Sequence, residues 1–506
     1  MRALEAILRA LLRRSPARRR RVAVLVAGVV AIVSWQAWFA TLPGQSFVSS
    51  HRVTASVGIQ AEPRFFFYLY HLGLLPLATN APIEHDTREE AKHLLNARPN
   101  DLIMEWGLTF ASGDRGRVYL YYVDALLHRN RVNPSLRAAN ALAFSLALVG
   151  VFAAFWWIGR PGFGFLLVLL FGSNPFQLDA IHGAENVFSW SITAMLALLA
   201  LHVPLVVDRP RTFRSIALTA IATGLLMATI RQVRSEPMTM LLSPILVYVT
   251  MRGATLKERL APIFLCLLCF GAASRLYGAA LEAKFHRTQQ IVQSVGGIPF
   301  PGPFVQYHEV WHPIWCGLGD FDTKYGYAWD DRRAYAYVLS VLEARAGHKL
   351  DLRPTFWAQS KSYDAKGRYP IPFFELAPGY HDIVRQKVLS DIRRDPGWYL
   401  DILKKRLRRI LTETTPVAVA LGETRLAFGA QWFGPACVAL ALALAVARRW
   451  EDLKLLAFAA PLSLGALLIY SDKGMTSYTS FHLVGAALFA SLALEGLRRV
   501  ARLPAD

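Results

Sequence analysis

Long apolar runs alternate with polar and often basic segments along most of the chain. Ten apolar runs with few charges lie at residues 22–41, 138–158, 161–174, 187–206, 214–230, 237–251, 260–280, 427–447, 454–471 and 478–496. A helix needs about 20 apolar residues to cross the hydrocarbon core of a bilayer, so the third and sixth runs are short for a complete crossing. The pattern predicts an all-α polytopic membrane protein with about 10 transmembrane helices.

Basic residues in the short connections predict how these helices are oriented. Twenty-one Lys and Arg residues lie in the N-terminal segment, in alternate connections and in the C-terminal tail, whereas the opposite short connections hold only Arg231, Arg234 and Lys473. Lys and Arg accumulate in cytoplasmic connections, so both termini are expected in the cytoplasm. The first run is interpreted as a retained helix because its apolar core is too long for a secretory signal.

Two segments are too long and too polar to be simple connections. They are residues 43–137 and 281–426, and the alternation of sides places both on the extracytoplasmic face. We expect mixed or helical structure in them, with interfacial helices in the first. The predicted order is a basic cytoplasmic N-terminus (1–21), a first transmembrane helix (22–41), a first extracytoplasmic loop (43–137), a six-helix block (138–280), a large extracytoplasmic loop (281–426), a three-helix block (427–496) and a basic cytoplasmic tail (497–506).

Composition agrees with this interpretation and excludes other classes of protein. Of the 506 residues, 54% are hydrophobic and 12% aromatic, which excludes a disordered chain, and four cysteines exclude a disulfide scaffold. A net charge of +20 would point to nucleic acid in a soluble protein, but here the positive-inside pattern accounts for it, and no nucleic-acid partner is expected. Cys266 and Cys269 lie inside one run, so their C-x-x-C spacing is not interpreted as a redox motif.

Carboxylates of the first loop are the first candidates for chemistry. Glu62 begins an apolar and aromatic stretch, 62–76, which is too short to span the membrane and predicts an interfacial helix or re-entrant turn. An acid there would lie beside a lipid-linked substrate, although Glu62 could instead complement a helix dipole. Glu105 is a rival candidate because the apolar neighbours Met104 and Trp106 would raise the pKa of its carboxyl group.

A second polar group separates the third and fourth runs. Asp179, His182 and Glu185 lie within seven residues of one another. Ionisable groups close to the membrane are costly and tend to be functional. The alternative is that Glu185 caps the fourth helix.

Two arginines and an acid end the fifth run. Arg231 and Arg234 are three residues apart, which predicts a shared helix face, and Glu236 follows. Forked guanidinium groups suit bidentate binding of phosphate. The alternative is that both arginines extend to lipid headgroups.

The large loop contains a match to a metalloprotease motif. His308-Glu309-Val-Trp-His312 fits H-E-x-x-H, in which two histidines on one helix face bind zinc and the Glu is the general base. Glu343 would be the third ligand. Pro313 shortens the helix that the motif needs, so no metal ligand is assigned from the sequence, and a His/Trp surface that contacts a sugar is the alternative.

Two later parts of this loop also have recognisable patterns. Four carboxylates alternate with five aromatic rings between Trp315 and Asp331, which suits either carbohydrate recognition or a well-packed loop. Pro396 then predicts the start of a basic amphipathic helix. Its apolar face is expected to contain Leu400, Leu403, Leu407 and Ile410, as is typical of a cationic helix on anionic lipid.

Taken together, these features resemble the C-type membrane glycosyltransferase superfamily. The resemblance covers most of the chain, including the many spans and the long first outward loop with an acid. The similar segments are Glu62-Pro-Arg-Phe-Phe-Phe-Tyr after the first helix, Arg137-Ala-Ala-Asn140 at the start of the second, Asn174-Pro followed by Glu185 before the fourth, and Asp395-Pro-Gly-Trp-Tyr-Leu before a basic helix.

The resemblance implies an inverting transfer of a sugar from a polyprenyl-phosphate donor. The acceptor would be an envelope glycan, lipid or protein on the extracytoplasmic face of the bacterial inner (plasma) membrane. A carboxylate, Glu62 or Glu105, would deprotonate the acceptor hydroxyl, while Arg231 and Arg234 stabilise the departing lipid phosphate. A polar cluster would orient the acceptor or hold a divalent cation such as Mg²⁺ or Mn²⁺, the one cofactor considered; its members are Asp179, His182, Glu185 and Glu236.

Two other classes of function stay open. A flippase or transporter of a lipid-linked glycan would need polar groups in several spans, whereas Arg275 is the main internal charge and no repeated halves are visible. A membrane-anchored zinc metalloprotease depends on His308, Glu309 and His312 alone.

Overall fold

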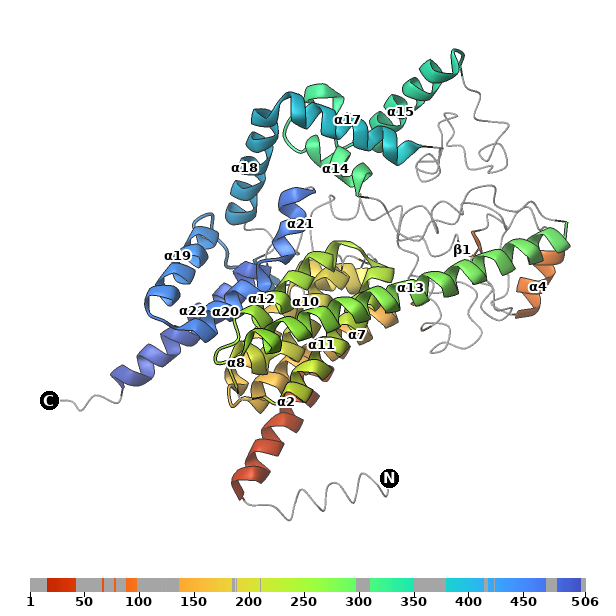
Figure 1. Ribbon diagram of the computed structural model, residues 1–506. Coiled ribbons are helices and arrows are strands. Elements are labelled where there is room, and N and C mark those ends of the chain that lie inside the picture. Colours follow the sequence, from red (N-terminus) through yellow and green to blue (C-terminus); the bar gives the residue numbers. More distant parts are fainter. Residues whose placement is uncertain are drawn as a thin grey trace.

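The structure is a computed structural model, and the regular elements among its described residues are helices and two short hairpins (Figure 1). The described residues are 16–41, 66–67, 77–78, 88–97, 120, 123, 136–183, 187, 189–209, 211–296, 310–349, 379–413, 417–422, 424–469 and 480–501. The hairpins are β1 (Phe66–Phe67) with β2 (Leu77–Ala78) and β3 (Ala418–Leu421) with β4 (Thr424–Ala427), both antiparallel. The short helix α4 (Arg88–Ala97) follows the first hairpin.

Apolar helices pack into a bundle around one central helix, α10. The bundle contains α2 (Pro16–Thr41), α7 (Arg137–Trp157), α8 (Pro161–Gly172), α10 (Ser189–Val206), α11 (Phe213–Val233), α12 (Leu242–Val249), α13 (Leu256–Ser294), α20 (Trp450–Ala459) and α22 (Ser480–Val500). In the apolar window of α10, 72% of residues are buried, against 17% in α2 and 22% in α13. Helices apolar on all sides are stable only when surrounded by protein or lipid, so the exposed apolar surfaces of α2 and α13 are those expected to face lipid.

The helical membrane architecture predicted from the sequence is confirmed, but the count of about ten spans is not. By length and composition, six of the described helices could cross a membrane, or seven if the bent pair formed by Pro161–Gly172 and Pro175–His182 is one span. Three other expected spans are shorter than a full crossing, and in the last of them Pro461 interrupts the helix, because proline lacks an N–H donor and disfavours a helix before it. They are η4 (Glu236–Leu241) with α12, α19 (Phe433–Val446), and α20 with α21 (Leu462–Leu468).

Ion pairs join several connections that the charge count assigned to one side of the membrane. The connection after α7 meets the start of α20, the connection after α10 meets α20 as well, and the connection before α20 meets the end of α22. The pairs are Arg160–Glu451 at 2.9 Å, Arg160–Asp452 at 3.2 Å, Lys454–Asp208 at 2.7 Å and Arg449–Glu495 at 3.1 Å. These alternate connections therefore do lie together at one end of the bundle.

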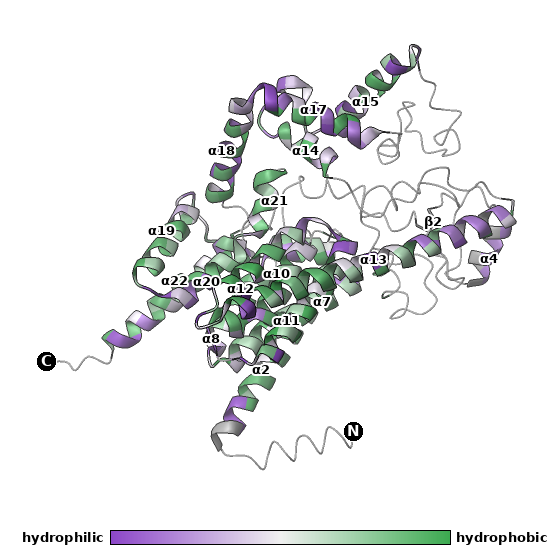
Figure 2. Ribbon diagram, in the orientation of Figure 1, coloured by the Kyte–Doolittle hydropathy of each residue, from purple (hydrophilic) through white to green (hydrophobic). Residues whose placement is uncertain are grey.

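A second group of helices lies at the other end, away from the start of α2 and the end of α22 (Figure 1). We call it the α14–α18 layer, and it contains α14 (Trp311–Leu318), η5 (Lys324–Gly326), α15 (Asp331–Ala346), α17 (Tyr380–Arg394) and α18 (Pro396–Thr412). Polar residues alternate with apolar ones along these helices, whereas the bundle is largely apolar (Figure 2). The layer is therefore built as a water-facing part of the protein.

A buried arginine, Arg406, pairs with an acid inside this layer and also attaches the layer to α21. The Nε of Arg406 on α18 lies 2.9 Å from Oδ2 of Asp320, which follows α14, and both side chains are 0% exposed. Arg406 also donates from Nη1 to the carbonyl oxygen of Leu467 in α21, at 3.1 Å. One guanidinium group thus connects three segments that are far apart in the sequence.

The helix expected from Pro396 is present, and the face that it buries shares only Ile410 with the predicted apolar face. Asp395 caps α18 by accepting a hydrogen bond from the Trp398 N–H. The hydrogen bond from the Lys324 ammonium, and secondly this cap, hold the pKa of the Asp395 carboxyl below its usual value. Leu400 and Leu407 are 63% and 47% exposed, as expected for a face that would lie on lipid, whereas Ile410 of the predicted apolar face is buried. The buried face consists of Trp398, Ile402, Arg406 and Ile410, because the Arg406–Asp320 pair turns that side inward.

Close packing of α11 on α13 gives a test of the bundle. A Cβ atom on Gly224 of α11 would lie 2.4 Å from the carbonyl oxygen of Cys266 and 2.8 Å from Cβ of Cys269, both on α13. Gly224→Ala should therefore lower the melting temperature of the detergent-solubilised protein, because two backbones must separate. Gly271→Ala is the matched control, since a Cβ atom at Gly271 would meet no other atom within 4 Å and the helix should tolerate or favour Ala. Equal melting temperatures for the two variants would contradict this packing.

Candidate functional site

A break in the α8 span creates the first part of the site. After α8 ends, α9 (Pro175–Leu178) begins at an angle, and the combined bend is 59°. The Asn174 side chain caps α9 by accepting a hydrogen bond from the Gln177 N–H at 3.1 Å. Two carbonyl groups released by the break are satisfied by other segments. The Gln36 amide donates to the Gly172 oxygen at 2.9 Å, and the Ala420 N–H of β3 donates to the Ser173 oxygen at 2.6 Å.

The segment after the break carries two of the predicted site residues into the interior. Asp179 and His182 lie on a π-helical turn, η3 (Asp179–Gly183), and are 1% and 5% exposed. Neither ring nitrogen of His182 has a hydrogen-bond partner among the described residues. Arg137, at the start of α7, lies within electrostatic range of this ring. Wide π turns of this kind are frequent at functional sites.

The first turn of α10 connects these residues to the others. The Gln177 side-chain amide donates to the carbonyl oxygen of Ser189 at 2.9 Å, and the Trp190 indole N–H donates to Oδ1 of Asn140 at 2.8 Å. Ser191 donates to Oε2 of Glu236 at 3.1 Å. We call this polar group the α10 mouth, and its members are Arg137, Asn140, Asp179, His182, Ser191, Arg234 and Glu236.

The structure separates the two arginines that were predicted to act together. Helix α11 ends at Val233, and Arg234 is extended, with φ −155° and ψ 136°, so it leaves the helix face of Arg231. Arg234 donates from Nε to Oε2 of Glu236 at 2.6 Å, and its side chain is only 10% exposed. Arg231 instead lies 5.5 Å from the ring of Phe270 on α13. The prediction of a shared face was wrong because the helix ends between the two residues.

The α10 mouth lies beside the helix that holds the α14–α18 layer. A Cβ atom on Gly465 of α21 would lie 3.7 Å from Cγ of Glu236, so this helix packs against the Arg234–Glu236 pair. The same helix accepts the hydrogen bond from Arg406 at Leu467. The buried Arg234–Glu236 pair therefore lies at the end of the bundle that faces the α14–α18 layer.

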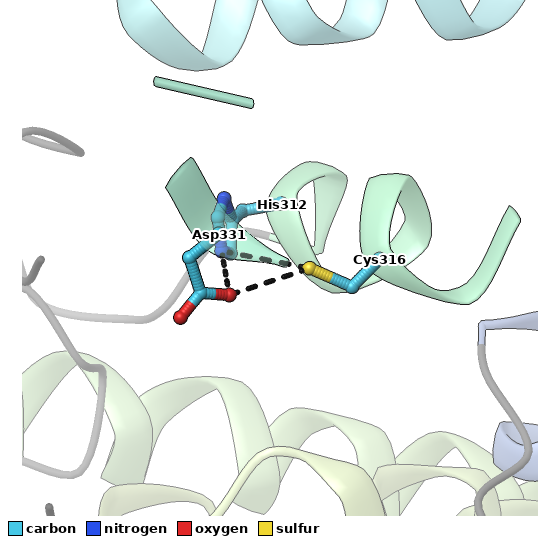
Figure 3. A group of neighbouring side chains, drawn as sticks. All are labelled: His312, Cys316 and Asp331. Carbon is cyan, nitrogen blue, oxygen red and sulfur yellow. Dashed lines mark hydrogen bonds and ion pairs between the residues drawn. The ribbon is translucent and has the colours of Figure 1, made fainter. Parts of the chain in front are cut away.

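A second group of reactive side chains lies within the α14–α18 layer. We call it the His312 cluster: His312 and Cys316 are one turn apart on α14, and Asp331 begins α15 (Figure 3). Oδ1 of Asp331 lies 3.0 Å from Nε2 of His312 and 3.4 Å from Sγ of Cys316, and the remaining Nε2–Sγ separation is 3.8 Å. Burial raises the pKa of the Cys316 thiol, while the nearby His312 opposes that shift.

The partner of His312 differs from the one expected for a zinc protease. The proposed third ligand Glu343 lies twelve residues after Asp331 on α15, about 18 Å further along the helix. Its carboxylate instead accepts a hydrogen bond from Lys349 at 2.7 Å. The sequence missed Asp331 because its approach to His312 depends on how α15 packs on α14.

Five of the residues singled out in the sequence lie outside the described residues: Glu62, Glu105, Glu185, His308 and Glu309. Another group was not anticipated. His202 of α10 is fully buried, with its Nε2 3.0 Å from the hydroxyl oxygen of Tyr248 on α12 and 3.5 Å from that of Thr223 on α11. A histidine inside an apolar run was the available signal, and it shows that the spans are less uniformly apolar than the sequence suggested.

Comparison of the chain with protein-family models, with curated proteins and with solved structures finds no match.

The Arg234–Glu236 pair can be tested by a double-mutant cycle. Removing one member of a buried ion pair leaves the other charge uncompensated, so Arg234→Met should lower the free energy of unfolding by about 3–5 kcal/mol. Arg234→Met combined with Glu236→Leu should recover much of that loss, because both charges are then removed. Unfolding by denaturant in detergent measures each variant, and Arg231→Met is the control, with an expected change of roughly 1 kcal/mol or less. Additive effects of Arg234→Met and Glu236→Leu would show that the two side chains are not coupled.

Proposed function

We propose that this protein is an integral membrane glycosyltransferase. It moves a sugar from a polyprenyl-phosphate donor to an envelope glycan, lipid or protein acceptor at the extracytoplasmic face of the cell inner membrane. The observation that supports this most is the α10 mouth, where Asp179, His182, Arg234 and Glu236 gather around one helix start at a bent span. Buried ionisable groups at the end of a membrane bundle are suited to chemistry on a lipid-linked substrate.

Charge at the α10 mouth fits a reaction in which a phosphate departs. Glu236 orients the Arg234 guanidinium through a short hydrogen bond, and Arg137 brings a second guanidinium to the same region. In the proposed roles these two cations stabilise the negative charge that develops on the lipid phosphate. Arg137 takes the place that the sequence gave to Arg231, because Arg231 packs on Phe270 instead.

The remaining roles complete an inverting transfer. Either Glu62 or Glu105 is the general base, which removes the proton of the acceptor hydroxyl as the bond to the sugar carbon forms. The bond from that carbon to the phosphate oxygen breaks, and its electron pair leaves with the lipid phosphate. Asp179 and Glu185 orient the acceptor or hold a divalent cation, Mg²⁺ or Mn²⁺.

The exposed face of α18 supports action at the membrane surface. Leu400 and Leu407 are exposed beside the basic residues Lys404 and Arg408. A helix with an apolar stripe bordered by basic side chains binds the boundary of an anionic bilayer. Such a helix would hold the α14–α18 layer close to a lipid-linked donor.

A second candidate function is a flippase for a lipid-linked glycan. It is favoured by the His202–Tyr248–Thr223 contacts in the middle of the bundle, since polar side chains inside membrane helices often mark a transport path. The two candidates differ in where the substrate accumulates when the protein is lost.

Mass spectrometry of envelope glycans and polyprenyl-phosphate lipids in a deletion strain and its parent separates them. For the transferase we expect the loss of one sugar from the envelope and accumulation of its lipid-linked donor. A complete glycan retained on the cytoplasmic side would favour the flippase. Unchanged glycans and lipids would contradict both.

Complementation of the deletion strain tests the residues. Glu62→Gln should reduce transfer by about 100-fold or more, because a positioned acid–base group contributes roughly 10²–10⁴ in rate. Asp179→Asn should also reduce transfer strongly, because the acceptor or the cation would lose a charged contact that positions it. Arg231→Ala is the matched control and should restore the parental glycan, since this side chain faces α13. Full restoration by Asp179→Asn would remove Asp179 from the proposed site.

A further inference from the structure

The His312 cluster has three chemically different ligand atoms that converge on one point (Figure 3). They are Nε2 of His312, Sγ of Cys316 and Oδ1 of Asp331, and all lie within 4.8 Å of one another. An imidazole, a thiol and a carboxylate are three of the groups that bind Zn²⁺ in proteins. The cluster lies in the α14–α18 layer and is separate from the α10 mouth.

The separations between these atoms agree with tetrahedral zinc. Zinc bonds of about 2.0–2.1 Å to N and O and about 2.3 Å to S require ligand atoms roughly 3.3–3.6 Å apart. The measured separations are 3.0 Å for N–O, 3.4 Å for S–O and 3.8 Å for N–S, so adjustments of a few tenths of an ångström are enough. A thiolate ligand selects zinc over Mg²⁺ or Mn²⁺, which prefer oxygen.

The surroundings of the cluster orient the imidazole as a metal ligand. The other ring nitrogen of His312, Nδ1, lies 2.6 Å from the hydroxyl oxygen of Tyr380 on α17, and the ring stacks on Tyr335 of α15. Metal-binding histidines characteristically use their second nitrogen in this way, which fixes the ring. His312 and Cys316 are buried, but the Asp331 side chain is 38% exposed, so water can reach the fourth position.

We infer that His312, Cys316 and Asp331 form a zinc site that joins α14, α15 and α17. Water completes the tetrahedron. When zinc binds, the Cys316 thiol loses one proton to solvent and forms the Zn–S bond. The proton on the His312 ring moves from Nε2 to Nδ1, where the N–H donates a hydrogen bond to the Tyr380 hydroxyl oxygen. The free Nε2 then binds the metal. The site stabilises the layer and is independent of the proposed transferase activity.

Metal analysis of the full chain, purified in detergent without chelators, tests this inference. We expect about one zinc per chain in the unaltered protein, and almost complete loss of zinc in Cys316→Ser and in Asp331→Asn. Two matched controls should keep the metal: Cys269→Ser removes a cysteine inside a span, and His308→Ala removes the other histidine of the H-E-x-x-H pattern. Zinc that is kept in Cys316→Ser and lost in His308→Ala would overturn the inference in favour of that pattern.

A spectroscopic measurement keeps the test decisive if the variants fail to fold. Cobalt substituted into the unaltered protein should give a near-ultraviolet thiolate-to-metal charge-transfer band, because Cys316 is a ligand. Removal of zinc by a chelator should also lower the melting temperature of the protein, and added zinc should restore it. Absence of bound zinc in the unaltered protein, or a cobalt spectrum without the thiolate band, would overturn the inference.

Discussion

The attachment of the α14–α18 layer to the rest of the protein depends on Arg406, which pairs with Asp320 inside the layer. Both side chains are completely buried, so neither can be lost without leaving the other charge in an apolar interior. The same guanidinium group holds the Leu467 carbonyl oxygen of α21. This contact sets how the water-facing layer sits on the bundle, and it also determines which face of α18 is buried.

A second constraint is that a broken membrane helix must satisfy its own backbone. The break after α8 releases carbonyl groups, which accept hydrogen bonds from the Gln36 amide and the Ala420 N–H. Because these hydrogen bonds satisfy the backbone at the break, Asp179 and His182 can occupy an irregular turn inside the protein. Two hydrogen bonds of the first turn of α10 connect this segment to Glu236. The Gln177 amide donates to the Ser189 carbonyl oxygen, and the Ser191 hydroxyl donates to Glu236. The polar site exists because the span is bent and not in spite of it.

The two sites differ in the kind of role that their surroundings suit. At the α10 mouth, charges of both signs are buried beside apolar helices, where electrostatic interactions are strong, which suits the proposed chemistry on a lipid-linked substrate. The His312 cluster instead lies among small amphipathic helices, which pack together mainly through aromatic side chains such as Trp315, Tyr335 and Tyr380. A metal ion there would stabilise packing that the short helices α14 and α15 supply only in part.

The sequence by itself determined the membrane class, the approximate positions of the long helices and the side on which the basic connections gather. These follow from local properties: the length of an apolar run, the positions of prolines and the distribution of Lys and Arg. The candidate residues Asp179, His182, Arg234 and Glu236 were also identifiable, because ionisable side chains next to apolar runs are conspicuous.

Only the tertiary structure decided which of these residues meet. The end of α11 at Val233 separates Arg231 from Arg234, and the packing of α15 on α14 pairs His312 with Asp331 and not with Glu343. Likewise, the turn of α18 toward Asp320 exposes Leu400 and Leu407. Contacts between distant segments depend on helix ends and helix rotation, and an error of one or two residues in either places a side chain on another face.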